Sequence, residues 1–192
     1  GSYLEAERLA WRAAGLLDDG TDPALRGAVL ALLGWALTLR GKASQARRVL
    51  GEASRLAEGL DPLGPDWSWL HLILRCQIPL GEFEQAKEKS LELGRRAREA
   101  GALATLSGML HVAADTAFRL GDWDTADAAA LEAIQVAGEV GQPAVAGWVL
   151  TIRARILAAQ GQPDEGRAAA QAALRIAETG RIDAGFRFVY AA

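Results

Sequence analysis

Four glycines stand at intervals of forty residues along the chain, and this spacing constrains the fold more than any other feature. They are Gly41, Gly81, Gly121 and Gly161. Four further columns keep the same spacing: a leucine eleven residues before each glycine, and mostly small residues five, twelve and sixteen after it. The columns are Leu30, Leu70, Leu110 and Leu150; Ala46, Ala86, Ala126 and Gly166; Ala53, Leu93, Ala133 and Ala173; and Ala57, Ala97, Ala137 and Ala177. A fixed period of this length is typical of a repeat array.

Within each forty-residue unit, apolar residues recur at intervals of three and four, which is the period of an α-helix. A first helix is expected over 23–40, 66–80, 103–120 and 143–160, and a second follows each glycine, as over 125–138. Asp and Pro in "TDP" at 21–23 and "GPD" at 64–66, together with Pro143, supply helix starts. Glycine can take a positive φ and so end the first helix. Pro79 is expected to break the last turn of its helix.

Neither helix of such a pair can bury its apolar face alone, so the pairs must stack on one another. No run shows the alternation of a β-strand. We therefore expect an all-α fold, a right-handed α-solenoid of antiparallel helix pairs. A single array would cover 3–192, with a half repeat at 3–20, full repeats at about 21–60, 61–100, 101–140 and 141–180, and a partial repeat at 181–192. Residues 1–2 resemble the scar of an expression tag, and the abrupt end within an expected helix resembles an excised fragment.

Composition narrows the class of partner. The net charge of the 192 residues is −3, with both signs interspersed, so no basic patch suited to direct nucleic-acid binding is expected. No apolar run is long enough to cross a membrane, so a membrane partner is not expected. The lone Cys76 makes neither a disulfide framework nor a zinc site. A cytoplasmic protein is therefore expected.

The repeat resembles the tetratricopeptide repeat over nearly the whole chain. The small residues Gly34, Ala114 and Ala154 of the first helix, the turn "LGDWDTA" at 120–126, and the alanines at 126 and 133 carry this resemblance. The chain departs from that family in its period of forty rather than thirty-four, in leucine in place of the common tryptophan, and in the missing terminal proline. The resemblance implies that the first helices line a concave face.

Longer repeats with the linkers "AREAG" at 97–101 and "AGEVG" at 137–141 look like the helical arrays of bacterial signal-transduction ATPases. The segment "AETGRIDAGFRFVYAA" at 177–192 is similar to the C-terminal halves of large ATP-dependent LuxR-type transcriptional regulators. Relatives of those regulators that control maltose genes bind an inducer on such an array. This resemblance implies a sensor or protein-interaction domain of a bacterial signalling or transcriptional regulator.

Motifs of catalysis are absent from the sequence. It contains no GxxxxGK[ST] phosphate loop, no GxSxG elbow, no HExxH and no CxxC, and no LuxR-type helix-turn-helix is recognisable. We therefore expect neither an enzyme nor a cofactor, and no direct contact between this segment and DNA.

Superposing the repeats brings both histidines of the chain into one column, beside a column that holds Trp35, Arg75, Asp115 and Arg155. The predicted ligand or partner groove consists of Trp35, His71, Arg75, His111, Asp115, Phe118, Trp148, Thr151 and Arg155. Arginines bind carboxylates or phosphates in a bidentate manner, and aromatic rings supply flat apolar walls.

Other interpretations of these residues stay open. Asp115 could pair with Arg75 and Arg155 only to hold neighbouring helices in register. His71, His111 and Asp115 have the right chemistry for a metal site, although satisfied or solvated histidines are far commoner. His111 with Asp115 could be part of a catalytic set, but no nucleophile accompanies them.

The sequence thus favours a non-catalytic binding scaffold whose concave groove holds a protein, a peptide or another domain of the same regulator. The alternative is a small-molecule receptor that binds an anionic inducer through Arg75, Arg155 and the two histidines. A metal-dependent enzyme is the third and weakest hypothesis.

Overall fold

The structure, a computed structural model, describes residues 3–64 and 67–180, and its regular elements are all α-helices. The helices are α1 (Tyr3–Ala14), α2 (Pro23–Leu39), α3 (Ala43–Ala57), α4 (Trp67–Gln77), α5 (Phe83–Glu99), α6 (Leu103–Arg119), α7 (Trp123–Glu139), α8 (Pro143–Ala159) and α9 (Pro163–Gly180). The all-α prediction is confirmed for these residues. The expected tag scar and the partial repeat 181–192 lie outside them.

The predicted helix starts at 22–23 and at Pro143 are used as expected, and Pro65 and Asp66 of the predicted start "GPD" lie outside the described residues. Asp22 caps α2, because its carboxylate accepts hydrogen bonds from the backbone N–H groups of Ala24 and Leu25, both at 3.0 Å. Pro23 and Pro143 occupy the first turns of α2 and α8, where no backbone N–H is needed. Helix α4 ends at Gln77, two residues before Pro79, as predicted.

Glycines with positive φ end the helices. They are Gly41, Gly81, Gly101, Gly121, Gly141 and Gly161. At Gly121, φ is +83°, and the next amide, of Asp122, donates to the carbonyl of Ala117 at 3.0 Å. This bond spans the left-handed residue and satisfies one of the last carbonyls of α6. Glycine therefore fixes where the chain reverses.

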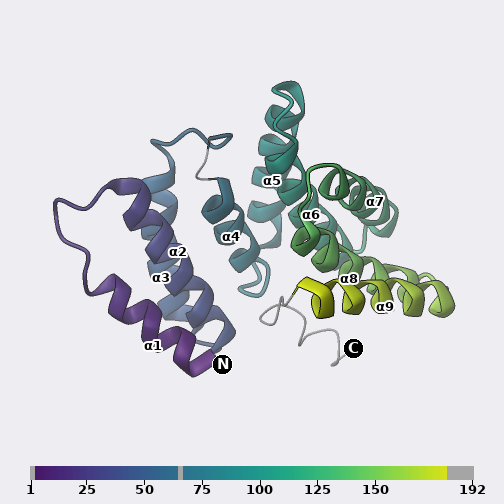
Figure 1. The fold of residues 1–192 in the computed structure, drawn as a ribbon, viewed down its shortest axis with the longest axis horizontal. Helices are drawn as coiled ribbons and strands as arrows, with labels where there is room; N and C mark the ends of the chain where they lie inside the picture. Colours follow the sequence, from purple (N-terminus) through teal and green to yellow (C-terminus); the bar gives the residue numbers. More distant parts are fainter. Residues whose placement is uncertain (1–2, 65–66, 181–192) are drawn as a thin grey trace. The chain divides into compact units, whose positions relative to one another are not determined.

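Consecutive helices pack in pairs, an arrangement typical of an α-solenoid. Helix α2 packs against α3, α6 against α7, and α8 against α9. The first helices also pack against one another, α2 on α4 and α6 on α8 (Figure 1). Side chains on neighbouring first helices therefore lie next to one another.

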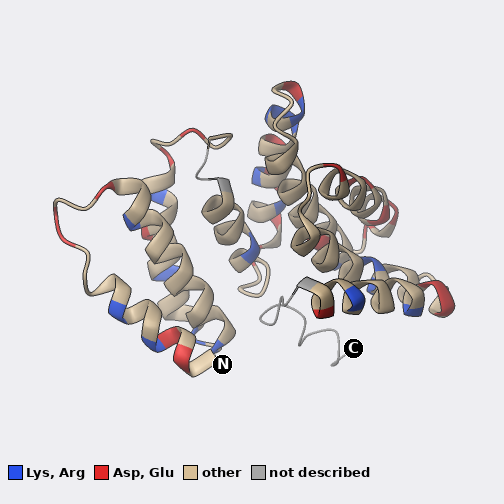
Figure 2. Cartoon of the chain, in the orientation of Figure 1, with Lys and Arg blue, Asp and Glu red and all other residues tan. Residues whose placement is uncertain are grey.

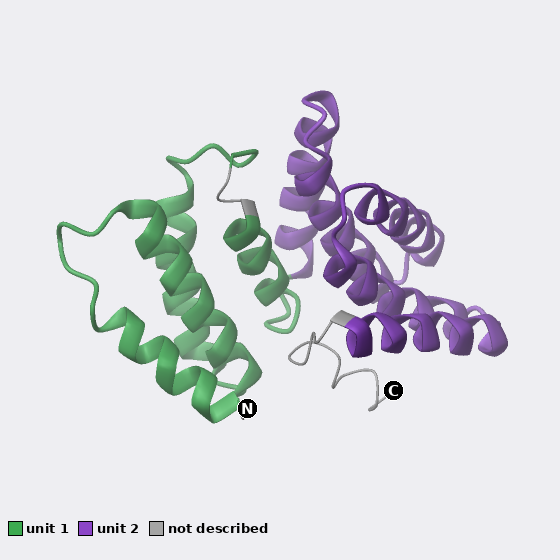
Figure 3. Cartoon of the chain, viewed as in Figure 1, with its two compact units in different colours: residues 1–82 green, residues 83–192 purple. Residues whose placement is uncertain are grey.

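The chain divides into two compact units, residues 1–82 and 83–192 (Figure 3). The first contains α1 to α4 and the second α5 to α9. The predicted repeat 61–100 therefore contributes one helix to each unit. In the view of Figure 2, Lys and Arg alternate with Asp and Glu in both units. Within the described residues, no helix combines the length and apolar character that crossing a membrane requires.

The small residues five positions after the turn glycines are buried, as the repeat predicts. Ala46, Ala86 and Ala126 are each 0% exposed. A Cβ added at Gly166 would lie 3.0 Å from the carbonyl oxygen of Ala154, so the backbones of α8 and α9 lie close together. The leucine column is less uniform, because Leu30 is buried whereas Leu70, Leu110 and Leu150 are half-buried.

The pair α2–α3 shows what the small residue in the first helix does. A Cβ added at Gly34 would lie 2.4 Å from the nearest side-chain carbon of Leu50, which is itself buried. Leu50 therefore fills the space that a side chain at Gly34 would need, and the close packing of the core leaves it little room to move.

We predict that Gly34→Ala destabilises the protein by about 1 kcal/mol, because overpacking of about 1–3 kcal/mol outweighs the helix propensity that alanine adds. Gly51, in the interior of α3, is the matched control, since a Cβ there meets nothing within 4 Å. Gly51→Ala should stabilise by up to about 1 kcal/mol. Urea unfolding measures both changes. Equal effects at the two positions would contradict the role assigned to Gly34.

Candidate ligand-binding face

The predicted groove residues are divided between the two units. Trp35, His71 and Arg75 belong to the first unit, and the remaining six belong to the second. The six are His111, Asp115 and Phe118 on α6, and Trp148, Thr151 and Arg155 on α8. The predicted pairing of Arg75 with Asp115 joins residues of different units, and it stays a prediction.

In the second unit, helices α6 and α8 bring two rings together. The imidazole of His111 stacks on the indole of Trp148, with ring centroids 5.8 Å apart and planes inclined by 23°. His111 is buried at 4% exposure, and Trp148 is half-buried. Packing of neighbouring first helices therefore places a flat aromatic surface at the predicted site.

One turn further along α6, Asp115 faces two guanidinium groups. Its Oδ1 accepts a hydrogen bond from Nε of Arg119 at 2.9 Å and forms an ion pair with Nη1 of Arg155 at 3.7 Å. Arg155 also lies over the ring of Phe118, its Cζ 4.5 Å from the ring centroid. The predicted Asp115–Arg155 ion pair is confirmed, and the aromatic ring supplies a second partner for the cation.

This group carries an excess of positive charge, since one carboxylate serves two arginines. The side chain of Asp115 is 15% exposed, whereas those of Arg119 and Arg155 are 33% and 37% exposed. Burial lowers the pKa of Arg155, Asp115 opposes this effect, and the charge of Arg119 adds to it. The pKa of an arginine stays far above neutrality even so, and both guanidinium groups remain charged. Donor groups that are only partly neutralised thus lie beside an aromatic wall.

Arg119 was not predicted, although a signal for it existed. Asp115 and Arg119 are four residues apart on one helix, the spacing at which opposite charges pair. The guanidinium of Arg119 also lies 5.8 Å from the ring centroid of Phe83 on α5. Comparing columns between repeats does not detect a partner on the same helix.

Thr151 contributes less than predicted. Its hydroxyl donates to the backbone carbonyl of Trp148 at 2.7 Å, so its hydrogen is used within α8. We name the other residues the α6–α8 face. They are His111, Asp115, Phe118, Arg119, Trp148 and Arg155.

In the first unit, Trp35 on α2 and Arg75 on α4 form a similar contact. The Cζ of Arg75 lies 4.8 Å from the centroid of the Trp35 ring. Both side chains are half-buried. A guanidinium over an aromatic face, contributed by neighbouring first helices, therefore occurs in each unit.

His71 and Cys76 lie on the same helix as Arg75, and both side chains are uncharged at neutral pH. Burial, assisted by the nearby charge of Arg75, lowers the pKa of His71 to about 3. Burial raises the pKa of the Cys76 thiol to about 12. His71 is thus a neutral ring and Cys76 a protonated thiol, and a buried protonated thiol does not match a nucleophile, which needs the thiolate and access to solvent.

The hypothesis of a metal site finds no support among the described residues. In 3–64 and 67–180, no three His, Cys, Asp or Glu side chains converge as metal ligands. The predicted trio of His71, His111 and Asp115 includes residues of both units.

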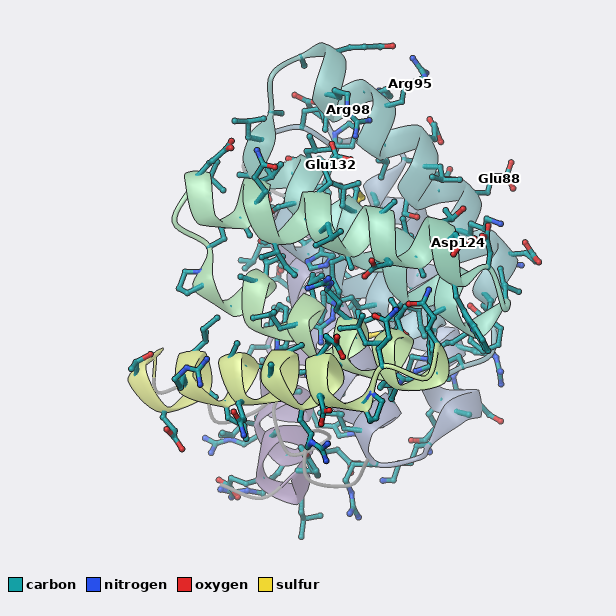
Figure 4. The ribbon with its side chains drawn as sticks, turned by 90° about the vertical axis from the view of Figure 1, so that its right-hand side faces the viewer. Glu88, Arg95, Arg98, Asp124 and Glu132 are labelled. Atoms are coloured by element: carbon teal, nitrogen blue, oxygen red, sulfur yellow. The ribbon has the colours of Figure 1, made fainter. Side chains whose placement is uncertain are left out.

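The second helices carry ion pairs on a different surface. Arg98 on α5 and Glu132 on α7 point toward one another, with Nη2 and Oε1 2.5 Å apart, whereas Glu88 and Arg95 project outward (Figure 4). These groups are exposed, and exposed ion pairs of this kind contribute little to stability. Arg95 and Arg98 thus lie on a solvated face.

No protein-family model matches the chain, and no curated protein matches it. Solved structures do match, among them the crystal structure of BtubC (BKLC) from P. vanneervenii. It shares 18% sequence identity, with a TM-score of 0.61 over 92% of this chain and 71% of that one. A likeness at this identity shows the helical fold alone.

A double-mutant cycle of Asp115→Asn and Arg155→Gln separates a structural tie from a binding group. We expect a coupling of about 0.5–1 kcal/mol in unfolding free energy, because the pair is half-buried and Asp115 also holds Arg119. Chemical denaturation of the four proteins measures this coupling. A coupling near zero would show that Arg155 does not hold α6 and α8 in register.

His71 makes stability depend on pH. Its pKa is about 3 in the folded protein, below its ordinary value of 6.5, so between these values the unfolded chain binds a proton that the folded state does not. Stability from this group is complete above pH 6.5 and is lost as the pH falls. From pH 7.5 to pH 5, wild type should lose about 2 kcal/mol more than His71→Gln. Urea unfolding at both pH values tests this, and equal losses would contradict a buried neutral histidine.

Proposed function

We propose that this chain is a non-catalytic binding scaffold, and that the α6–α8 face is where it holds its partner. The observation that carries the proposal is the convergence, from two neighbouring helices, of two partly neutralised arginines and a flat aromatic surface. Such a face suits a carboxylate next to an apolar group, as on an acidic peptide. No cofactor or chemical step is part of the proposal.

The family context is part of the same proposal. We propose a right-handed array with a forty-residue repeat of the tetratricopeptide type, from a bacterial LuxR-type regulator or a related signalling protein. The spacing of the turn glycines and the buried small-residue columns support the repeat. The sequence features at 97–101, 137–141 and 177–192 support the regulator.

The mechanism would be a shift in population. The groups of the face belong to two different first helices, so a partner that bridges Arg155 on α8 and the surroundings of His111 on α6 favours one spacing of those helices. A change in the spacing of α6 and α8 would shift the helices packed on them, and with these any domain or protein that packs against the array. Binding would thereby control another domain or protein without chemistry.

A small-molecule receptor is the second candidate, favoured by the excess positive charge at Asp115. Two guanidinium groups share this one carboxylate, and a small anion would neutralise the positive charge that remains. The half-buried position of Arg155 strengthens such an interaction, because the attraction between opposite charges is stronger where water is partly excluded.

Selection of binders tests both candidates. A phage-displayed library of random peptides and a panel of small carboxylates and phosphates are screened against the wild type. We expect binders that are acidic and that lose at least about tenfold in affinity, or about 1.4 kcal/mol, on Arg155→Gln. Calorimetry measures the affinities, and a thermal shift confirms binding to the folded state.

Arg153→Gln is the matched control for this test. Arg153 lies on the same helix as Arg155, is also partly buried, and pairs with Asp127 of α7 at 2.9 Å instead of facing α6. Binding should survive this change. Acidic peptides without any small-molecule binder would favour the scaffold, and a metabolite would favour the receptor. Binders that tolerate Arg155→Gln and Arg119→Gln would contradict both.

A further inference from the structure

Helix α1 presents an apolar stripe to solvent. Ala6, Leu9 and Ala13 follow one another at intervals of three and four, and Leu16 continues the stripe just past the helix end. Leu9 is 50% exposed and Leu16 is 83% exposed, while Ala6 is exposed and Ala13 half-buried. Apolar residues at this spacing normally lie against another element.

A neighbouring side of α1 is already packed against α2. Ala10, Ala14 and Leu17 contact the core of the first unit. The buried carboxylate of Glu7 accepts from Nζ of Lys42 at 2.5 Å and from Nε of Arg40 at 3.2 Å. These contacts fix the rotation of α1 about its axis, so α1 cannot rotate to bury the stripe against α2.

Two positions of the stripe correspond to buried positions of the later second helices. Forty residues and multiples of forty after Ala6 stand Ala46, Ala86 and Ala126, each 0% exposed. The positions equivalent to Ala13 are at most 4% exposed, and they are Ala53, Leu93, Ala133 and Ala173. The positions equivalent to Leu9 include the exposed Lys89, so Leu9 lies at the edge of this side. On α3, Leu50 lies between Ala46 and Ala53 and fills the space next to Gly34 of the first helix α2. Ala6 and Ala13 therefore lie on the side on which a second helix receives the first helix of its own pair.

Helix α2 carries a second exposed stripe next to the first. Leu25 is 57% exposed and Leu32 is 56% exposed. The equivalent residues of α6 and α8 are buried, with Thr105 at 2%, Val112 at 0%, Val145 at 5% and Ile152 at 3%, and Leu72 of α4 is half-buried. In α8, that side packs against α6 and α7, the pair that precedes it.

We propose that these two stripes form the seat of one further α-helix, which belongs to the same polypeptide and is joined to Tyr3 through a short turn. It would pair with α1 as α2 pairs with α3, and it would pack on α2 as α6 packs on α8. We name the two stripes together the end groove, with residues Ala6, Leu9, Ala13, Leu16, Leu25 and Leu32.

The chain supplies a probe for this seat. Residues 141–162 contain α8 with its flanking turns, and Pro163 stands four periods after Tyr3, so this segment placed directly before Tyr3 enters in register. We expect the extension to raise Tm by several degrees, through burial of the exposed leucines. Hydrogen exchange of the α1 amides should slow in parallel.

Ala6→Lys and Leu4→Lys make the test specific. Ala6 is exposed on α1 but corresponds to the fully buried Ala46, Ala86 and Ala126. Leu4 is 59% exposed on the same helix but lies off the stripe, where later second helices carry Ser44, Glu84 and Asp124. In the 192-residue chain, both changes should shift Tm by less than about 2 °C, because both side chains are exposed. In the extended chain, Ala6→Lys should lower Tm by about 5 °C or more, and Leu4→Lys should stay neutral.

Two results would overturn the proposal. One is an equal response to the two lysine variants in the extended chain, together with unchanged hydrogen exchange in α1. Residues 101–122, which contain α6 in the same register, serve as a second extension in case the first does not order. The other is a dimer of the unextended chain, seen by sedimentation and abolished by Ala6→Lys, because a second copy would then be the occupant.

Discussion

Close approach of two helix backbones is the constraint on which the rest of this structure depends. Small residues permit it, and the chain uses them on whichever helix of a pair needs the space: glycine at 34 against Leu50, and glycine at 166 against the carbonyl of Ala154. Because the two helices of a pair lie so close together, their own side chains cannot cover all of the pair's apolar surface. Each pair must then use its neighbours to remove apolar area from water, which extends the fold in one direction.

This direction of growth explains how a binding face arises without a cleft in any single pair. Stacking puts the same column of successive first helices side by side, so residues far apart in sequence but equal in repeat position become neighbours. His111 and Trp148 meet in this way, and so do Asp115 and Arg155. Substitutions in these columns do not disturb the turns or the close contacts on the other side of the helix, so the face can diversify while the architecture stays constant.

Much of the local structure could be predicted from the residues, because it depends on local chemistry. Asp22 and Pro23 start a helix wherever they precede an apolar pattern, and glycine ends one at Gly121 through its backbone alone. The Asp115–Arg155 contact was also predictable, since it needs only a repeat period and a stacking rule. Arg119 was missed because its partner lies on its own helix, where comparison between repeats is blind. The exposure of Leu25 and Leu32 was equally hidden, because the pattern of an apolar stripe does not reveal whether something covers it.

The alanines of α7 have a mechanical consequence. Ala126, Ala130, Ala133 and Ala137 are fully buried in the core of the second unit, and a row of methyl groups has no long side chains that interlock with a neighbour. Helices in contact through such a smooth ridge can slide along their axes by fractions of an ångström with little loss of contact. We expect the second unit to yield more readily along the axes of these helices than across them. A bound partner that clamps α6 to α8 would act as a brake on that sliding, and the stiffness of the unit would itself report that the face is occupied.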